Sequence, residues 1–482
     1  MAPEPSHPES SSLPNAWPGE PGVTTDRGPP FVAGDDATRW LFSLNRFGIR
    51  PGLRRINGLL AELGHPEQQV PTLVVAGTNG KGSTTRILAT LLQHAGYRVG
   101  CFTSPHLLRV HERITINEQP VGEATLAEKI EKLRPAVETH EASWFETLTA
   151  LALDISRDEQ VELLCCETGL GGRLDATNAL PALATLLVSV SSDHCSVLGR
   201  TLPEIVTEKL GLLKRNTPLF CGVGKELRPQ VFQSAVTAGS PCHFLDELVR
   251  WEMEGEHWQL ITRHAVIPGL PTPSAPVLVR NMALALLCLE ELAVQGVLRS
   301  PPDPATALTH LFLPGCFQQV FSSPDWVFDT AHNSVALCTA LDAYRDRPCR
   351  GRRWILFGCM QDKELGSEVG ERLRDFDGVV AAPINLPRSR NLSSLMELLK
   401  TWRIPVGDRL QIVPDIQTAI VHLARVLKPA DTVLVTGSCF LVAEVLYCMG
   451  VRDLNETREV RPAAKVLAAF DSTAGGGEPV DC

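Results

Sequence analysis

The sequence predicts an α/β fold in which a larger block of alternating strands and helices precedes a smaller one, with a disordered tail at each end. Short Val- and Leu-rich runs alternate with longer amphipathic runs, as in doubly wound, mostly parallel sheets. A Pro-rich polar stretch interrupts this alternation near residues 296–306. Both ends of the chain are rich in Pro, Ser, Gly and acidic residues, a composition typical of disorder.

The elements follow in chain order. We expect domain boundaries at 1–36 (tail), 37–298 (larger block), 305–455 (smaller block) and 456–482 (tail). Helices are expected over residues 83–96, 280–296 and 393–402. The expected strands are the apolar runs at 72–77, 99–103, 161–168, 184–190, 218–222, 326–330, 353–358, 378–383 and 431–437.

Composition excludes several classes of protein. The net charge is −10 and no long basic run occurs, which argues against a nucleic-acid partner held through phosphates. No stretch of about 18 apolar residues is present, so we expect no membrane span. The 14 cysteines include no C-x-x-C pair, which fits reduced thiols and a cytoplasmic location.

A glycine-rich stretch between the first expected strand and helix indicates a phosphate-binding loop. It reads VVAGTNGKGSTTRILATLL over 74–92. Gly77, Gly80 and Gly82 let backbone N–H groups approach an anion, and Lys81 can reach its outer phosphates. The common pattern G-x-x-x-x-G-K-[ST] is not met literally, because Val75 stands at its first glycine. The alternative is a strand-to-helix turn without a ligand.

Further motifs follow this loop in a characteristic order. They are TSPHLLRVHERITIN (103–117), WFETLTALA (144–152), ETGLGGRLDATN (167–178), DH…LG…EKLGLLK (193–214), FDTAHN (328–333) and VTGSCFLVAEVL (435–446). Over residues 37–450 the chain resembles the folylpolyglutamate synthase/dihydrofolate synthase family of the Mur ligase superfamily. The resemblance implies a P-loop-containing Mur-ligase-like ATPase domain, followed by a smaller Rossmann-like glutamate-ligase domain.

The resemblance also implies a reaction. Family members use ATP to phosphorylate a pterin-linked carboxylate, and the amine of L-glutamate then displaces phosphate from the acyl phosphate. The expected substrates are ATP, L-glutamate and a pterin acid, which is dihydropteroate, a reduced folate, or either of the two. We also expect a monomer. One alternative is a Mur-type ligase that acts on a different carboxylate. Another is a nucleotide-binding homologue with reduced activity.

Site residues are transferred by position. The family's Mg²⁺ ligands correspond to Ser104, Glu167 and His194, which hold one or two ions. Lys209 corresponds to a lysine that is carbamoylated. The expected catalytic residues are Lys81, Lys209 and His332. His332 is expected to act as a phosphate contact or as an acid/base group. The expected ATP contacts are Gly80, Lys81, Gly82, Ser83, Asn281 and Asp329.

The expected pterin pocket corresponds to two short segments. The segment SWFE contributes Phe145 and Glu146, and the segment GRLDA contributes Leu174, Asp175 and Ala176. An aromatic ring beside a carboxylate suits a flat ring that carries amide and amino groups. The alternative is that Trp144 and Phe145 are core residues at helical spacing.

One position departs from the family pattern. Relatives carry Pro-Gly-Arg before the FDTAHN motif, whereas this sequence reads LPGCFQQV, with Cys316 in place of the arginine. A thiol offers neither charge nor a planar fork to a phosphate. The sequence leaves three alternatives: substitution by another residue such as Arg280 or Lys363, reduced activity, or a non-catalytic role.

Overall fold

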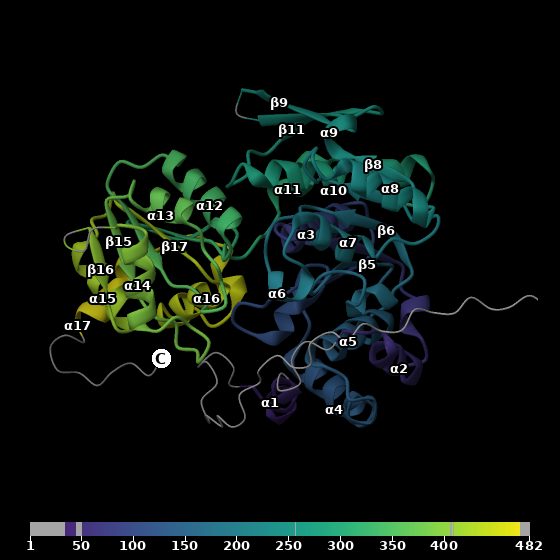
Figure 1. Cartoon of the computed structure of the whole chain (residues 1–482), viewed down its shortest axis with the longest axis horizontal. Helices are drawn as coiled ribbons and strands as arrows, with labels where there is room; N and C mark the ends of the chain where they lie inside the picture. Colours follow the sequence, from purple (N-terminus) through teal and green to yellow (C-terminus); the bar gives the residue numbers. More distant parts are fainter. Residues whose placement is uncertain (1–33, 45–50, 256, 405–406, 408, 473–482) are drawn as a thin grey trace, which may run out of the picture.

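The computed structural model describes residues 34–44, 51–255, 257–404, 407 and 409–472. Two α/β lobes lie side by side, the purple-to-teal first lobe and the green-to-yellow second lobe (Figure 1). Of the expected N-terminal tail, all but residues 34–36 lies outside the described residues, as do residues 473–482. No described helix combines the length and apolarity needed to cross a bilayer.

The first domain is built on an eight-stranded sheet in the order β4-β3-β2-β5-β1-β6-β7-β8. Pairing is parallel from β2 to β8, whereas β3 is antiparallel to both of its neighbours, β2 and β4. The strands are β1 (Thr72–Ala76), β2 (Val99–Phe102), β3 (Ile114–Ile116), β4 (Gln119–Pro120), β5 (Leu163–Glu167), β6 (Ala182–Leu187), β7 (Leu219–Cys221) and β8 (Cys242–Phe244).

Helices cover both faces of this sheet, which explains why its central strands are apolar throughout. Leu73 and Val75 of β1 face one hydrophobic cluster, whereas Val74 and Ala76 face another. The first domain's helices are α1 (Asp36–Ser43), α2 (Arg54–Glu62), α3 (Lys81–His94), α4 (Glu123–His140), α5 (Trp144–Asp158), α6 (Cys195–Leu198), α7 (Leu202–Leu210), α8 (Arg228–Ala238), α9 (Leu245–Leu248), α10 (Val277–Val294) and α11 (Pro304–Thr309), with short 3₁₀ turns η3 (Pro66–Gln68), η4 (Val110–Arg113) and η5 (Ala176–Ala179).

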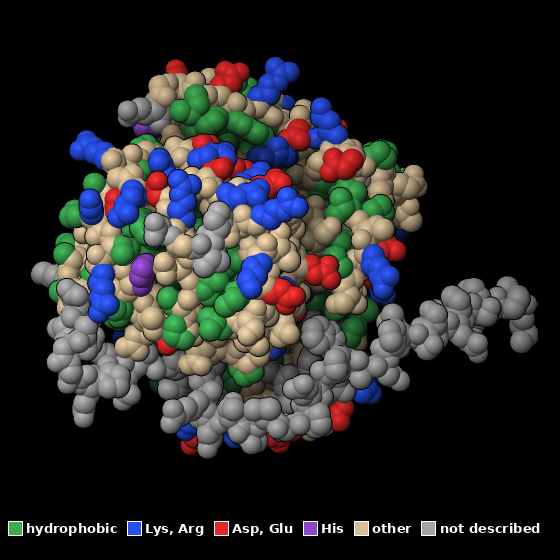
Figure 2. Space-filling view, turned by 60° about the vertical axis from the view of Figure 1, so that its left-hand side comes forward, with side chains coloured by type: hydrophobic (Ala, Val, Ile, Leu, Met, Phe, Trp, Pro, Cys, Tyr) green, Lys and Arg blue, Asp and Glu red, His purple; other side chains and the backbone are tan. Residues whose placement is uncertain are grey.

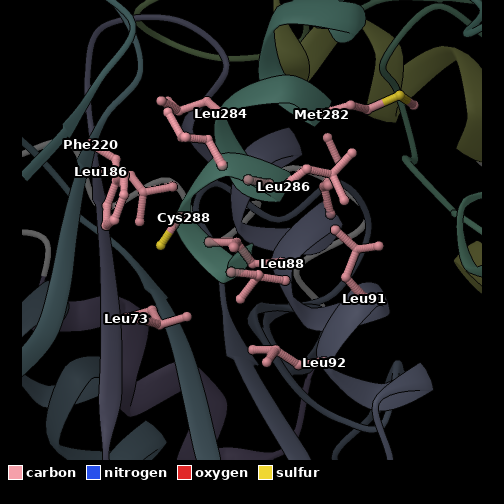
Figure 3. Packing of buried hydrophobic residues seen from close by; sticks show 14 of the residues in the cluster. Leu73, Leu88, Leu91, Leu92, Leu186, Phe220, Met282, Leu284, Leu286 and Cys288 are labelled. Carbon is pink, nitrogen blue, oxygen red and sulfur yellow. The ribbon is translucent and has the colours of Figure 1, made fainter. Parts of the chain in front are cut away.

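Helix α3 is fixed by its packing against α10. Figure 3 shows Leu88 and Leu91 of α3 beside Leu286 of α10, and all three are fully or almost fully buried. This contact holds the helix that begins at the glycine-rich loop against the sheet. The loop therefore has a rigid support.

A three-stranded antiparallel sheet that the sequence did not predict covers α10 and α11. Its strands are β9 (Arg250–Glu254), β10 (His257–Ile261) and β11 (Val266–Leu270), at the top of Figure 1. Most of their residues are exposed and only Leu260 and Leu270 are buried. These strands therefore contain no long apolar run from which the sequence could predict them.

The second domain has a seven-stranded sheet in the order β16-β15-β14-β17-β13-β12-β18. Pairing is parallel from β16 to β13, and β12 is antiparallel to β13. The elements are β12 (Gln318–Ser322), β13 (Asp325–Phe328), α12 (Ser334–Asp346), β14 (Arg353–Phe357), α13 (Ser367–Leu373), β15 (Gly378–Ala381), α14 (Leu392–Thr401), β16 (Leu410–Ile412), α15 (Ile416–Val426), β17 (Thr432–Thr436), α16 (Cys439–Cys448), η6 (Leu454–Thr457), β18 (Arg461–Pro462) and α17 (Ala463–Ser472).

Two expected boundaries need correction. Helix α11, placed by the sequence at the start of the smaller block, packs on α3 and β11, and its Ala307 and Leu308 lie in the first domain's core. The expected tail at 456–482 is wrong for its first part, because β18 pairs with β12 and α17 packs on α15. Leu467 and Phe470 of α17 are buried at helical spacing, a signal too short to stand out in a polar, Gly-rich end.

Candidate active site

The candidate site lies where the central strands of the first sheet end. Strands β2, β5, β1 and β6 are neighbours and parallel, so their carboxyl ends share one edge. Ser104 follows β2, Glu167 ends β5, the glycine-rich loop follows β1, and His194 follows β6. The topology thereby gathers four expected site segments.

The glycine-rich loop is tied to the segment after β6. Thr78 N–H donates to the Ser189 carbonyl at 2.8 Å, and Asn79 N–H donates to Ser189 Oγ at 3.0 Å. Gly80 begins α3 with φ +82°, in the left-handed region that favours glycine, and no described side chain caps this end of α3. The first N–H groups of α3 are therefore available to an anion.

Lys81 and Glu167 face each other at this edge. Lys81 Nζ lies 3.9 Å from Glu167 Oε1 and donates to the Thr78 carbonyl at 3.1 Å. Glu167 Oε2 accepts the N–H of Ser104 at 2.8 Å. Burial raises the pKa of Glu167, and the charge of Lys81 opposes that rise. A buried carboxylate with its nearest paired cation 3.9 Å away suits an added positive charge.

The expected metal set fits a divalent ion. Gly82 leaves room beside the carboxylate, since a Cβ there would lie 3.2 Å from Glu167 Oε2. Burial and the charge of Lys363 lower the pKa of His194 to about 4, so its imidazole is neutral at pH 7, as a ligand must be. Among the described residues no three His, Cys, Asp or Glu side chains converge. The set therefore depends on the hydroxyl of Ser104.

Lys209 is a buried lysine on α7. Its Nζ donates to the Gly77 carbonyl at 2.7 Å, and only 4% of the residue is exposed. Burial, then the charge of Lys81, lower its pKa to about 7. Lys209 is therefore not a solvent-exposed helix lysine.

The second domain presents the FDTAHN segment to the same place. Asp329, just past β13, accepts the N–H of Phe317 and of Ala331, each at 2.9 Å. Burial raises the pKa of Asp329 to about 6, although these N–H groups oppose the rise. His332 Nδ1 lies 3.0 Å from the Thr330 carbonyl and donates to it, and Nε2 faces the carboxylate of Asp193.

Asp193 joins the two domains, and the sequence did not single it out. This buried carboxylate accepts from Lys363 Nζ at 2.7 Å and from Asn333 Nδ2 at 3.1 Å, and lies 3.6 Å from His332 Nε2. Burial alone would raise its pKa, but His332 and Lys363 hold it well below the ordinary value. Asn333 also exchanges hydrogen bonds with Asn79.

A cleft of about 510 Å³ lies between the domains and is lined by residues of both. Asn281 of α10 also lines it, and a Cβ on Gly80 would lie 2.9 Å from Asn281 Nδ2. The sequence-predicted residues that line the cleft are Gly80, Lys81, Gly82, Ser83, Ser104, Glu167, His194, Lys209, Asn281, Asp329 and His332.

Comparison with known proteins now decides the family. Residues 317–439 match the family model described as "Mur ligase, glutamate ligase domain". The dihydrofolate synthase/folylpolyglutamate synthase of Escherichia coli K12 is 30% identical over 413 residues, which cover 86% of this chain and 94% of that protein. The chain belongs to the dihydrofolate synthase/folylpolyglutamate synthase family.

Solved structures of family members share the fold. E. coli FolC in complex with DHPP and ADP has a TM-score of 0.77 at 30% identity, covering 85% of this chain and 97% of that one. A bifunctional enzyme with Mn, AMPPNP and L-glutamate bound has a TM-score of 0.77 at 27% identity, covering 86% and 98%. The expected two-domain α/β fold and ATP-dependent ligase class are confirmed.

In this member of the dihydrofolate synthase/folylpolyglutamate synthase family, Cys316 lies at the phosphate loop. Its Sγ is 3.5 Å from Ser83 Oγ. Burial raises its pKa to about 12, so the thiol is neutral. The two replacements suggested by the sequence have other partners: Arg280 Nη1 pairs with Asp246 at 2.8 Å, and Lys363 pairs with Asp193.

The five expected pterin contacts lie behind the cleft wall. Glu146 forms a capping box with Ser143 and pairs with Arg55 at 3.0 Å. Asp175 caps η5 and accepts the N–H of Leu170, which does line the cleft. The ring of Phe145 packs against Gly169, where an added Cβ would lie 2.6 Å from it. Leu174 is half-buried, and Ala176 is a core residue. They shape the segment around Leu170, and direct contact with substrate stays a prediction.

Proposed function

We propose that this protein joins the α-amine of L-glutamate to a pterin-linked carboxylate, that of dihydropteroate, of reduced folates, or of both. ATP supplies the energy through an acyl phosphate. The observation that carries the proposal is the cleft itself, in which the loop of Lys81 and the buried Glu167 of one domain face Asp329 and His332 of the other. Structures of relatives with ADP, DHPP and L-glutamate support it.

Phosphoryl transfer needs positive charge and N–H donors around the moving group. The N–H groups at the start of α3 bind the phosphate chain, and Lys81 reaches its outer part. A carboxylate oxygen of the acid substrate attacks the γ-phosphorus, the bond to the β–γ bridging oxygen breaks, and ADP leaves. Asn281 and Asp329 orient the nucleotide from the cleft walls.

Ser104, Glu167 and His194 hold Mg²⁺ in this proposal. The ion, when bound, neutralises charge on the phosphate oxygens. The chain's contribution is to keep Glu167 ionised and oriented, through Lys81 and the N–H of Ser104. Relatives crystallised with manganese support a divalent site.

Lys209 is proposed to carry a carbamate. A pKa near 7 leaves much of its amine unprotonated at neutral pH, and the unprotonated nitrogen is the form that adds CO₂, with loss of one proton. The product is an anion among the phosphate-site cations, able to hold a second metal ion or its water. Lys209→Arg keeps the charge but cannot be carbamoylated. It should lose bicarbonate-dependent activity.

Amide formation follows in the same cleft. The glutamate amine attacks the acyl carbon, the C–O bond to phosphate breaks, and inorganic phosphate leaves. In this proposal His332 takes the amine proton at Nε2, since its Nδ1 donates to the Thr330 carbonyl, and the Asp193 carboxylate 3.6 Å from Nε2 stabilises the imidazolium that results. The cytoplasmic location and monomeric state stay predictions.

The proposal is tested by phosphate release with ATP, Mg²⁺ and L-glutamate, comparing dihydropteroate, tetrahydrofolate and no pterin. Product masses are checked for one added glutamyl residue. Turnover with dihydropteroate alone identifies a dihydrofolate synthase, and turnover with tetrahydrofolate alone identifies a folylpolyglutamate synthase. Turnover with both substrates identifies a bifunctional enzyme. Absence of glutamate-dependent turnover with either acid, in protein that binds ATP, would contradict the proposal and favour the nucleotide-binding role.

A further inference from the structure

Arg86 is a cleft-lining cation with no role in the site described so far. It lies on α3, three residues after Ser83 and four after Gly82, so these residues share one side of the helix. Side chains on a helix lean toward its N-terminus. A long side chain at this position therefore extends back toward the phosphate loop.

The guanidinium of Arg86 has little to hold it. Within the described residues its Nη2 donates to Thr103 Oγ1 at 3.4 Å, which is long for a hydrogen bond. In the part of the chain that the structure describes, no carboxylate oxygen lies within 4.0 Å of it. Thr103 directly precedes Ser104, so the guanidinium reaches the segment after β2.

The other cations around the cleft are held by partners. Arg280 pairs with Asp246, Lys363 pairs with Asp193, and Lys209 donates to the Gly77 carbonyl. Lys81, at the start of α3, donates to the Thr78 carbonyl at 3.1 Å and lies 3.9 Å from Glu167. An arginine that lines a cleft with unused donors is suited to a bidentate anion.

The charge of Arg86 also reaches the carboxylates of the site. Burial raises the pKa of Glu167 and brings that of Glu112 to about 7, and the charge of Arg86 opposes both rises. The positive charge of Arg86 is thus close enough to lower the pKa of Glu167, the carboxylate that faces Lys81. Cys316 lies against Ser83, one turn of α3 away, and supplies no charge there.

We propose that Arg86 binds the phosphoryl group as it passes from ATP to the substrate carboxylate, and holds the acyl phosphate that results. Its guanidinium supplies the positive charge and the paired N–H donors that the thiol of Cys316 lacks. The proposal rests on the ligase function proposed above. Arg86 neither gains nor loses a proton; its N–H groups contact oxygens whose charge grows while one P–O bond forms and the other breaks.

The test compares Arg86→Gln with Arg86→Lys in the glutamate-dependent phosphate assay. Loss of a donor that acts in the transition state lowers kcat by roughly 10²–10³. We expect a fall of this size for Arg86→Gln, a smaller fall for Arg86→Lys, and an unchanged KM for L-glutamate. Arg280→Gln, a cleft arginine already held in an ion pair, should lose less than about fivefold.

A rescue experiment asks whether residues 86 and 316 serve the same anion. Cys316→Arg in the Arg86→Gln background should restore kcat at least about tenfold and change the wild-type rate little. No recovery, or a kcat for Arg86→Gln within about twofold of wild type, would overturn the proposal. A raised KM for ATP at unchanged kcat would also overturn it. Turnover by the wild type decides the ligase function independently, and equal melting temperatures exclude misfolding.

Discussion

At the scale of single residues, the phosphate loop depends on a backbone shape that only glycine adopts without strain. Gly80 has φ +82°, and a Cβ there would lie 2.9 Å from Asn281 Nδ2. The left-handed conformation costs other residues about 1–2 kcal/mol. Both the strain and the contact with Asn281 would move the start of α3.

Gly80→Ala should therefore raise KM for ATP about tenfold or more while the protein stays folded. Gly96→Ala is the matched control, since Gly96 has φ +84° with nothing within 4 Å of its added Cβ. It should show similar backbone strain in thermal melts and normal kinetics. Equal KM values for the two variants would contradict the role of the Gly80–Asn281 contact.

Asp329 predicts a pH dependence of stability. Burial raises its pKa from 3.8 to about 6, so the folded protein keeps this proton to a higher pH than the unfolded chain does. The resulting stabilisation is complete below about pH 4 and is lost as pH rises through 6, by at most about 3 kcal/mol.

Thermal melts of wild type and Asp329→Asn from pH 4 to 7 check this dependence. The variant lacks the titration, so the wild-type melting temperature minus that of the variant should fall between pH 4 and 6 and then level off. A difference that is constant across the range would mean that Asp329 is ionised in the folded protein at pH 4.

Which residues could be predicted from sequence depends on how local their signal is. Lys81, Glu167 and Asp329 stand at strand ends inside distinctive motifs, and the structure brings them to one cleft. Asp193 was overlooked because its partners Asn333 and Lys363 lie 140 and 170 residues away. A side chain whose role comes from the other domain carries no local signal.

At the scale of elements, α3 is positioned by its buried face rather than by a capped N-terminus. Leu88 is fully buried among Leu91, Leu286 and their neighbours (Figure 3). Helix α10, which carries Asn281, packs on the same face. The apolar contact between α3 and α10 therefore fixes two walls of the nucleotide site.

Leu88→Ala should lower the free energy of unfolding of the first domain by about 2–5 kcal/mol, through lost burial and a residual cavity. Urea unfolding measures it, followed by loss of activity and by the fluorescence of Trp251 and Trp258, which pack against the same cluster as Leu88. Val294→Ala, on the exposed end of α10 at 60% exposure, should change stability by less than about 0.5 kcal/mol. Comparable losses in the two variants would contradict this packing account.

Element prediction succeeded for the central strands with long apolar runs and failed for short strands at or near the sheet edges and in the small sheet. The nine expected strands correspond to β1, β2, β5, β6, β7, β13, β14, β15 and β17. The missed strands have two to five residues each, and all but β3 and β12 lie at a sheet edge or in the small three-stranded sheet; they are β3, β4, β8, β9, β10, β11, β12, β16 and β18. Edge and insertion strands lack the continuous apolar run that made the central strands visible.

At the scale of the whole molecule, the two domains are joined by polar and apolar contacts on either side of the cleft. Asp193 gathers Lys363 and Asn333, while Leu107 and Leu108, from the segment after β2, pack into the second domain's core. Charged side chains of both signs are interspersed on the face drawn in Figure 2.

Asp193→Asn removes the charge that Lys363 and His332 face, and truncating one partner of a buried charge pair costs about 2–5 kcal/mol. We expect KM for ATP or L-glutamate to rise at least about tenfold and small-angle scattering to show a larger radius of gyration. Asp431→Asn is the control, because Asp431 pairs with Arg352 inside the second domain. A variant at Asp193 with normal KM values and unchanged size would refute the interdomain role.

The central claim is that this cleft activates a carboxylate by transferring a phosphoryl group to it. Dihydropteroate or tetrahydrofolate labelled with ¹⁸O in the reacting carboxyl group tests it directly in the presence of ATP, Mg²⁺ and L-glutamate. An acyl phosphate must pass one labelled oxygen to inorganic phosphate in each turnover, so the released phosphate should carry ¹⁸O. Glutamylated product formed with unlabelled phosphate would contradict the account.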